Sequence, residues 1–253
     1  MKKEVLLYEV KDRITFITLN NPPRNLLDPD LCNALGEAWD RFAQDSESRV
    51  ALLSANGPDF SFGADLRHKG LLKDLRKAFP QNGTKILKPI VGAVHGTVAG
   101  SGYGLSIYGT DITLATEDTQ FIFGEAWVGI VGSVIEYAPY MLFKPALEFY
   151  LTGQPLGGRR AYEIGLINRV TKDKEELMAE AYKMACILRD NAPLTLRAIK
   201  YGHYKNLESA ARKAMRQAQE EFEAFIQPQL DSEDLQEGIR ALKEGRKPVF
   251  QGR

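Results

Sequence analysis

Net charge, cysteine, histidine and long apolar runs are all scarce or absent in this sequence of 253 residues. Its 33 lysines and arginines balance its 33 aspartates and glutamates, so no overall field favours nucleic acid or an anionic membrane surface. The basic residues from Arg240 to Arg253 are expected to form mostly a solvated face. No apolar run approaches membrane-spanning length, and no apolar core of the signal-peptide kind follows the first charged residues. These absences predict a cytoplasmic protein with neither nucleic acid nor a membrane as a partner.

The two cysteines and three histidines show no disulfide or metal-binding pattern. Cys32 and Cys186 lie far apart within expected helices, which predicts two reduced, buried thiols. His68, His95 and His203 have no spacing typical of metal ligands, so no metal site is predicted. A structural role is expected for His95, which directly precedes a glycine-rich loop.

The stretch from residue 88 to residue 125 carries the clearest functional signal. A short apolar run at 90–94 predicts a buried strand, and four glycines fall within the nine residues 96–104. Glycines at a strand-to-helix junction let backbone amides approach a ligand closely, and the helix start adds a partial positive charge. Such a loop can hold an anion or an oxygen that becomes anionic during a reaction. Glu125 ends an apolar run that begins at Phe121, where burial is expected to raise the pKa of its carboxyl group.

The hydrophobic pattern along the chain predicts a mixed α/β fold. Expected strands lie at 5–10, 14–19, 50–54, 90–94, 111–115, 121–123 and 166–170. Expected helices begin at Asp28-Pro29 and then lie at 139–150, 158–164, 175–189, 193–204 and 208–226. A glycine-bearing turn at 57–66 could present backbone amides as the later loop does, and segment 66–85 is expected to cover the core. The pattern therefore predicts a strand-and-helix core followed by a helical layer.

Short motifs spread over nearly the whole chain resemble the enoyl-CoA hydratase/isomerase (crotonase) superfamily. They lie at 19–25, 60–66, 88–96, 151–153, 161–168 and 237–253, and their order and spacing carry the resemblance. The resemblance implies crotonase-like ββα repeats that form two roughly perpendicular sheets over residues 1–192. It implies a C-terminal helical region at 193–253 that is used for trimer packing. It also implies a homotrimer or homohexamer and a coenzyme A thioester as the substrate, with no additional cofactor.

The same resemblance assigns roles to individual residues. The backbone amides of Ala64 and Ser101 would bind the thioester oxygen, with Gly102 as an alternative to Ser101 because one extra residue precedes Asp111. Two such donors stabilise an enolate, and removing one typically costs about 3 kcal/mol of transition-state stabilisation. Glu125 would be the catalytic residue that moves the proton. Further substrate contacts are implied for Arg24, Leu66, Gly102 and Tyr103.

The chain departs from the family at the first of the two glutamates that typical hydratases carry. That position falls on Gly104, or on Leu105 if the gap is placed earlier, and neither side chain can transfer a proton. A single glutamate can still move a proton between two carbons, or activate a water that other groups hold. Tyr103 and Glu136 are candidates for holding such a water. The predicted function is hydration or double-bond isomerisation of an enoyl-CoA through a stabilised thioester enolate.

The same residues allow other functions to be considered for this protein. Residues 57–64 are similar to those of hydratases that act on alicyclic dienoyl-CoA, and the missing glutamate also fits a non-catalytic acyl-CoA-binding or interaction protein. A dinucleotide-binding loop is disfavoured because Leu105 stands where the third glycine of that fingerprint would fall. A nucleophilic serine is disfavoured because Ala99 and Tyr103, and not glycines, lie two residues either side of Ser101.

Overall fold

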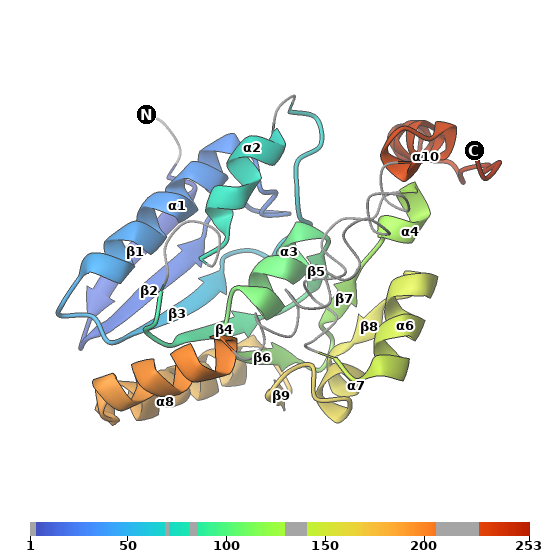
Figure 1. Cartoon of the computed structure of the whole chain (residues 1–253). Coiled ribbons are helices and arrows are strands. Elements are labelled where there is room, and N and C mark those ends of the chain that lie inside the picture. Colours follow the sequence, from blue (N-terminus) through green and yellow to red (C-terminus); the bar gives the residue numbers. More distant parts are fainter. Residues whose placement is uncertain (1–3, 69–70, 81–85, 130–140, 206–227) are drawn as a thin grey trace. The chain divides into compact units, whose positions relative to one another are not determined.

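The computed structural model describes residues 4–68, 71–80, 86–129, 141–205 and 228–253 (Figure 1). Its contacts divide the chain into two compact units. The first unit contains Met1–Ile122 and Leu156–Tyr201, and the second contains Phe123–Pro155 and Gly202–Arg253. Both of the described sheets belong to the first unit.

A six-stranded sheet forms the centre of the first unit. Its strand order is β1-β2-β3-β4-β6-β9, in which β1 and β2 form an antiparallel hairpin and the other neighbours are parallel. The strands are β1 Leu6–Lys11, β2 Ile14–Leu19, β3 Val50–Ala55, β4 Ile90–Val94, β6 Ile112–Thr116 and β9 Arg169–Thr171. The hairpin turns at Asp12 and Arg13, whose φ angles of +51° and +64° match the twist of the flanking strands. The predicted mixed α/β core is confirmed.

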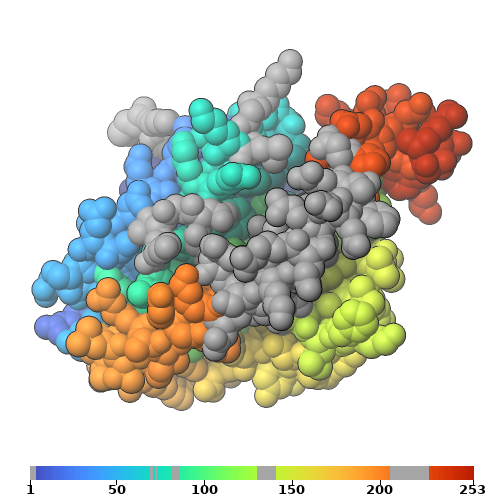
Figure 2. Space-filling view, viewed as in Figure 1, coloured from blue at the N-terminus to red at the C-terminus, as the bar shows by residue number. Residues whose placement is uncertain are grey.

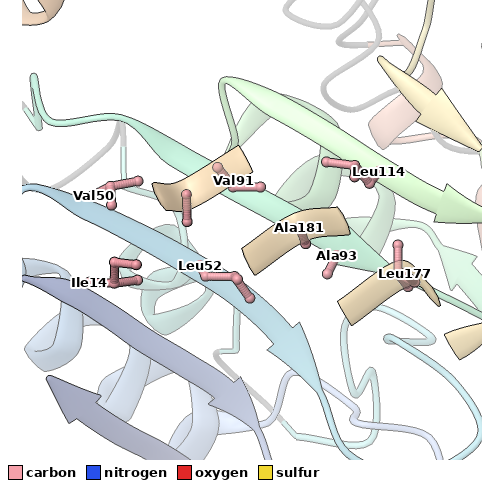
Figure 3. Packing of buried hydrophobic residues seen from close by; sticks show 9 residues of the cluster. Ile14, Val50, Leu52, Val91, Ala93, Leu114, Leu177 and Ala181 are labelled. Carbon is pink, nitrogen blue, oxygen red and sulfur yellow. The ribbon is translucent and has the colours of Figure 1, made fainter. Parts of the chain in front are cut away.

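Two long helices cover opposite faces of this sheet (Figure 1). Helix α1, Pro29–Gln44, begins as predicted, because the Asp28 side chain accepts from Leu31 N at 2.8 Å and Pro29 occupies the first turn. Helix α8, Lys174–Asp190, packs on the other face. Strand side chains alternate between the two faces, so every second residue meets α8. The core on the α8 side contains Ile14, Val50, Leu52, Val91, Ala93, Leu114, Leu177 and Ala181 (Figure 3).

The segment predicted to cover the core contains two short helices. These are α2, Leu71–Leu75, and the 3-10 helix η1, Arg76–Ala78. Both contact α1, and Trp39 Nε1 of α1 donates to Ala78 O at 2.8 Å. The orange residues, which include α8 and the chain that follows it, form part of the surface seen in Figure 2.

A second, three-stranded sheet contains β5 Thr97–Ala99, β7 Gln120–Ile122 and β8 Leu156–Gly157. Strand β5 leads directly into α3, Ser101–Tyr103, and then into η2, Gly104–Tyr108, a turn of π-helix. This sheet therefore positions the glycine-rich loop, because Gly100 N donates to Ile122 O of β7 at 3.0 Å.

The strand β9 is shorter than the sequence predicts. Helix α7, Gly158–Glu163, is followed by a turn in which Leu166 N donates to Ala161 O at 2.9 Å. This bond holds the chain in the turn, so the strand begins at Arg169 and not at Leu166.

The described part of the second unit is helical. It contains α4 Glu125–Val128, α6 Phe143–Thr152 and α10 Glu233–Glu244. The Phe123 ring packs against Tyr150, with ring centroids 4.9 Å apart. The helix predicted at 208–226 lies outside the described residues. Among the described helices, none combines the length and the apolar character that crossing a membrane requires.

Candidate active site

The backbone at Ala64 is fixed by hydrogen bonds on either side of it. Leu27 N donates to Gly63 O at 2.8 Å, and Asp65 N donates to Leu27 O at 3.1 Å. Because successive residues of extended chain point to opposite sides, the N–H of Ala64 points away from Leu27. Within the described residues no acceptor lies within hydrogen-bond reach of this N–H. The Ala64 N–H is therefore left without a partner among the described residues, as the predicted role of a ligand donor requires.

Ser61 ties this loop to the second sheet. Its hydroxyl donates to Asn25 O at 2.8 Å and accepts from Gly63 N at 3.1 Å, and its backbone carbonyl accepts from Ala99 N at 2.8 Å. The buried Asn25 side chain in turn donates to Asp59 O at 2.9 Å. These bonds join the Ala64 loop to the start of the glycine-rich loop.

Two glycines let the loops come into direct contact. A Cβ atom at Gly63 would lie 2.7 Å from Ala99 O and 2.9 Å from Ser101 N, which is closer than side-chain carbons pack. A Cβ atom at Gly102 would lie 2.6 Å from Ser61 O. Ser101 is the first residue of α3, so its N–H has no partner within the helix, and none is found elsewhere in the described residues. The structure thus brings the N–H groups of Ala64 and Ser101 together on adjoining loops.

The turn after the glycine-rich loop is wider than an α-helix. Gly109 N donates to Gly104 O at 3.1 Å, a bond between residues five apart that encloses one more residue than an α-helical bond. Buried hydroxyls support this turn: Thr110 Oγ1 and Thr113 Oγ1 donate to Ser106 O at 2.6 and 3.1 Å. Such π-turns are frequent at functional sites. The π-turn was not predicted from the sequence.

The positions considered for a second proton-transfer group are buried in the first unit. Gly104 is buried at the start of η2 and has no side chain. Tyr103 is fully buried, and its ring meets Phe121 edge-on with centroids 6.3 Å apart. This packing gives the Tyr103 ring a structural role in the core. A contact between Tyr103 and the substrate stays a prediction. Glu136 lies outside the described residues.

Exposed side chains surround the Ala64 loop. The Arg24 guanidinium lies over the Phe62 ring, 5.2 Å from its centroid, and Leu66 is 58% exposed. Asp65 is buried and binds Arg67 through two bonds of 2.7 Å, so the Arg67 guanidinium lowers the pKa of that carboxyl group. His68 also contacts Asp65, at 3.5 Å. Arg24 and Leu66 are thus exposed beside Ala64, where a molecule bound by the Ala64 amide could contact them.

Glu125 belongs to the second unit. It is the first residue of α4 and is half-buried. Phe123, two residues earlier, is buried against Phe149 and Tyr150. The carboxylate thus follows an apolar cluster, as the sequence predicted.

His95 has structural partners at the end of β4. It is buried, and its Nε2 lies 2.9 Å from Lys174 Nζ and 3.0 Å from Gly57 O. Lys174 Nζ donates to Ala55 O and Gly57 O, each at 3.1 Å. The three donors of the ammonium group match Nε2 and these two carbonyls when the neutral imidazole carries no proton on Nε2. Burial is the main reason that the pKa of His95 is lowered.

This arrangement predicts that acid destabilises the fold. Because the pKa of His95 is lower in the folded chain than in the unfolded chain, the unfolded chain binds the proton first as the pH falls. The contribution of neutral His95 to the free energy of unfolding is fully present above about pH 6.5, the pKa of histidine in the unfolded chain. Below that pH the free energy of unfolding falls by at most about 1.4 kcal/mol per pH unit, until the pH reaches the pKa of His95 in the folded chain. The hydrogen bond to the Gly57 backbone favours protonation, as do Asp59 and Asp118, whereas Lys174 opposes it. Urea unfolding above and below this pH should show a smaller loss for His95→Gln than for the wild type. Equal losses would contradict the assignment.

Among the described residues no group of three histidine, cysteine, aspartate or glutamate side chains could hold a metal ion. The two cysteines differ in burial, since Cys186 is only partly buried and the prediction of two buried thiols is wrong for it. Both cysteines are free thiols, and Cys32 is fully buried. Burial raises the pKa of Cys32 to about 12, which keeps it protonated at neutral pH and unreactive.

The site is thus an α/β core with two touching loops, each of which carries a backbone N–H group without an acceptor among the described residues. The chain belongs to the enoyl-CoA hydratase/isomerase family, whose family model matches residues 9–253.

Relatives with named activities match nearly the whole chain. It is 32% identical over 250 residues to a carnitinyl-CoA dehydratase of Salmonella typhi, covering 94% of each chain. It is 29% identical over 252 residues to a probable enoyl-CoA hydratase of Bacillus subtilis, covering 94% of this chain and 95% of that one. The chain also matches the solved structure of a carnitinyl-CoA dehydratase from Mycobacterium avium 104, with 31% identity and a TM-score of 0.83. This match covers 98% of the present chain and 99% of the other chain. These matches confirm the predicted family and fold.

Proposed function

We propose that the protein adds water to an enoyl-CoA thioester, or removes it in the reverse direction, with double-bond isomerisation as a related reaction. In this proposal the N–H groups of Ala64 and Ser101 bind the thioester oxygen and Glu125 transfers the proton. The observation that supports it most directly is the pair of N–H groups on adjoining loops, which have no acceptor among the described residues. Removal of one such donor typically costs about 3 kcal/mol of transition-state stabilisation.

The reaction places charge on the atom that these amides would contact. When hydroxide from water adds to the β-carbon, the electrons of the double bond move into the thioester carbonyl, and its oxygen becomes an enolate oxygen. Donors fixed in place before the reaction stabilise that charge without reorganising. Glu125 would take the proton from the attacking water and return it to the α-carbon, so one carboxyl group serves as base and then as acid. Isomerisation needs the same carboxyl group but no water.

The π-turn favours Ser101 over Gly102 as the second donor. The resemblance implies one extra residue between the glycine-rich loop and Asp111, and the bond from Gly109 N to Gly104 O encloses one residue more than an α-helical bond. If the insertion is absorbed in η2, the residues before it keep their places. Ser101 then retains the donor position.

The names of the relatives favour water addition or removal as the main reaction. They are a carnitinyl-CoA dehydratase and a probable enoyl-CoA hydratase. Linear and alicyclic enoyl-CoA thioesters incubated with the protein in heavy-oxygen water should therefore give products that carry one heavy oxygen atom. An isomerised product without heavy oxygen would show that the main reaction is double-bond isomerisation and not hydration. Thioesters that bind without any product would favour a non-catalytic acyl-CoA-binding protein.

Arg24 is proposed to bind a phosphate group of coenzyme A. Its exposed guanidinium is held over the Phe62 ring beside the Ala64 loop. Arg24→Ala should raise KM about tenfold, because one charge-assisted hydrogen bond to the phosphate is lost. The value of kcat should stay nearly unchanged, because the phosphate is remote from the reacting carbons. Steady-state kinetics of this variant and of Arg159→Ala, which changes another exposed arginine, would test the assignment. A fall in kcat at constant KM would contradict it.

The proposed assembly is a homotrimer or homohexamer of the 28.3 kDa chain. Helix α6 supports self-association, since Phe143, Leu147 and Leu151 recur at helical spacing and are 72%, 38% and 72% exposed. An apolar stripe of this kind is typical of contacts between protein chains. Sedimentation equilibrium would decide, and a monomer mass would contradict the proposed assembly.

A further inference from the structure

The helix that begins with Glu125 cannot hold its position alone. Helix α4 has four residues, and isolated helices of that length are unstable in water. Gly124 at its start provides no side-chain cap. The position of the Glu125 carboxylate in the second unit must therefore come from the elements that pack against α4.

Helix α10 packs directly on the backbone of α4. A Cβ atom at the buried Gly238 would lie 2.5 Å from the carbonyl carbon of Val128 and 2.7 Å from its Cα. The contact continues at the end of α4, where a Cβ atom at Gly129 would lie 3.1 Å from Asp234 O. The first contact joins backbone to backbone, so no side-chain rotation could make room for a larger residue at position 238.

Trp127 holds the other side of α4. Its Nε1 donates to Thr152 O at 3.2 Å, and a Cβ atom at Gly153 would lie 2.7 Å from its Cε2 atom. Helix α4 is thus held between α6 and α10, and movement of α10 would be passed to Glu125.

Helix α10 is itself tied to the segment that follows it. The Glu237 carboxylate is 8% exposed and accepts from Arg240 Nε at 3.0 Å, Arg246 Nη2 at 3.0 Å and Val249 N at 3.1 Å. Asp234 accepts from Gln251 N at 2.6 Å and from the next amide at 2.8 Å. These bonds fasten residues 246–252 to the helix.

We infer that Gly238 is a positioning residue, which sets the place of Glu125 by allowing α10 to contact the backbone of α4, and that Glu237 supports it by anchoring α10. This inference rests on the proposed role of Glu125. An added methyl group at residue 238 must move α4 or α10 apart, and a misplacement of about 1 Å far from the chemistry can lower a rate about a hundredfold.

Gly238→Ala is expected to lower kcat about 10- to 100-fold and to change KM by less than about threefold. The matched control is Gly202→Ala, another helical glycine, at which a Cβ atom would meet no described atom within 4 Å. That variant should keep wild-type kinetics. Glu237→Gln, which keeps the shape but removes the charge, should lower kcat less than Gly238→Ala does. Circular dichroism would confirm that each variant is folded at the assay temperature.

A double variant separates positioning from a general structural defect. If Gly238 acts through Glu125, adding Gly238→Ala to Glu125→Gln should not lower the residual rate further, because the two changes remove one function. A further fall would overturn the inference, as would wild-type kcat or a change confined to KM in Gly238→Ala. Full activity in Glu125→Gln alone would instead overturn the proposed function on which the inference rests.

Discussion

Glu125→Gln should lower kcat about a thousandfold while leaving KM within about threefold of the wild type. The glutamine has the shape of the glutamate and can still donate and accept hydrogen bonds, but its amide cannot take up a proton at neutral pH. A positioned acid or base typically contributes a factor of about 10² to 10⁴ to the rate. The resemblance places the family's other glutamate at Gly104 or Leu105, and neither residue has a carboxylate to share the work.

The control for this change is Glu148→Gln. Glu148 lies on α6 in the same unit and is exposed, so this variant makes the same chemical change away from the apolar cluster. Steady-state kinetics should be those of the wild type. If Glu125→Gln also turned over normally, the proton would have to move through another group, and the single-glutamate mechanism would be wrong.

The elements that the sequence predicts well are those with local signals. Asp28 followed by Pro29 fixes the start of α1, because the carboxylate caps free amides and proline suits the first turn. The glycines at 96–104 were expected to let backbone amides approach a ligand, whereas in the structure Gly63 and Gly102 also allow the two loops to touch, which was not predicted. For the start of α1 the physical cause lies within three residues of the signal, because Asp28 caps Leu31 N, whereas the partners of the two glycines lie 36 or more residues away.

The π-turn and the hydrogen bonds of Ser61 could not be predicted from local sequence signals. The turn at 104–108 depends on Thr110 and Thr113 hydroxyls that reach the carbonyl of Ser106, and nothing in the local sequence separates it from an α-helix. Likewise, the Ser61 hydroxyl bonds the backbone of Asn25, 36 residues away. Contacts between distant residues require the fold before they can be recognised.

The basic residues near the end of the sequence show the same limit. They are exposed, as expected, but Arg240 and Arg246 also bind the buried Glu237. The bonds from Arg246 and Arg240 hold the pKa of the Glu237 carboxyl group well below its usual range. A regular helix brings Arg240 near Glu237, but Arg246 arrives only because the chain turns back after α10 at Gly245, whose φ is +67°. The charge pattern alone could not indicate which arginines are paired.

Gly63→Ala is expected to lower kcat about 10²- to 10³-fold, the effect of losing one oxyanion donor. Gly63 has a φ of +85°, which residues with a side chain adopt at a cost of about 1 to 2 kcal/mol. Its new methyl group would also meet Ala99 O at 2.7 Å and Ser101 N at 2.9 Å. The loops that carry the two N–H groups must then separate, so the amides can no longer converge on one oxygen.

The strain in Gly63→Ala also lowers stability, so the kinetic effect needs a matched glycine. Gly157→Ala adds the same methyl group in β8, where the nearest described atom is Gln120 Nε2 at 3.8 Å and φ is not positive. Urea unfolding and steady-state kinetics of both variants, measured where each is fully folded, separate loss of folding from loss of the oxyanion contact. A folded Gly63→Ala with the kcat of Gly157→Ala would show that the paired amides do not bind the reacting oxygen. A folded but slow variant would support the binding of that oxygen by both loops, since a methyl group at residue 63 changes neither a proton-transferring side chain nor the coenzyme contact proposed for Arg24.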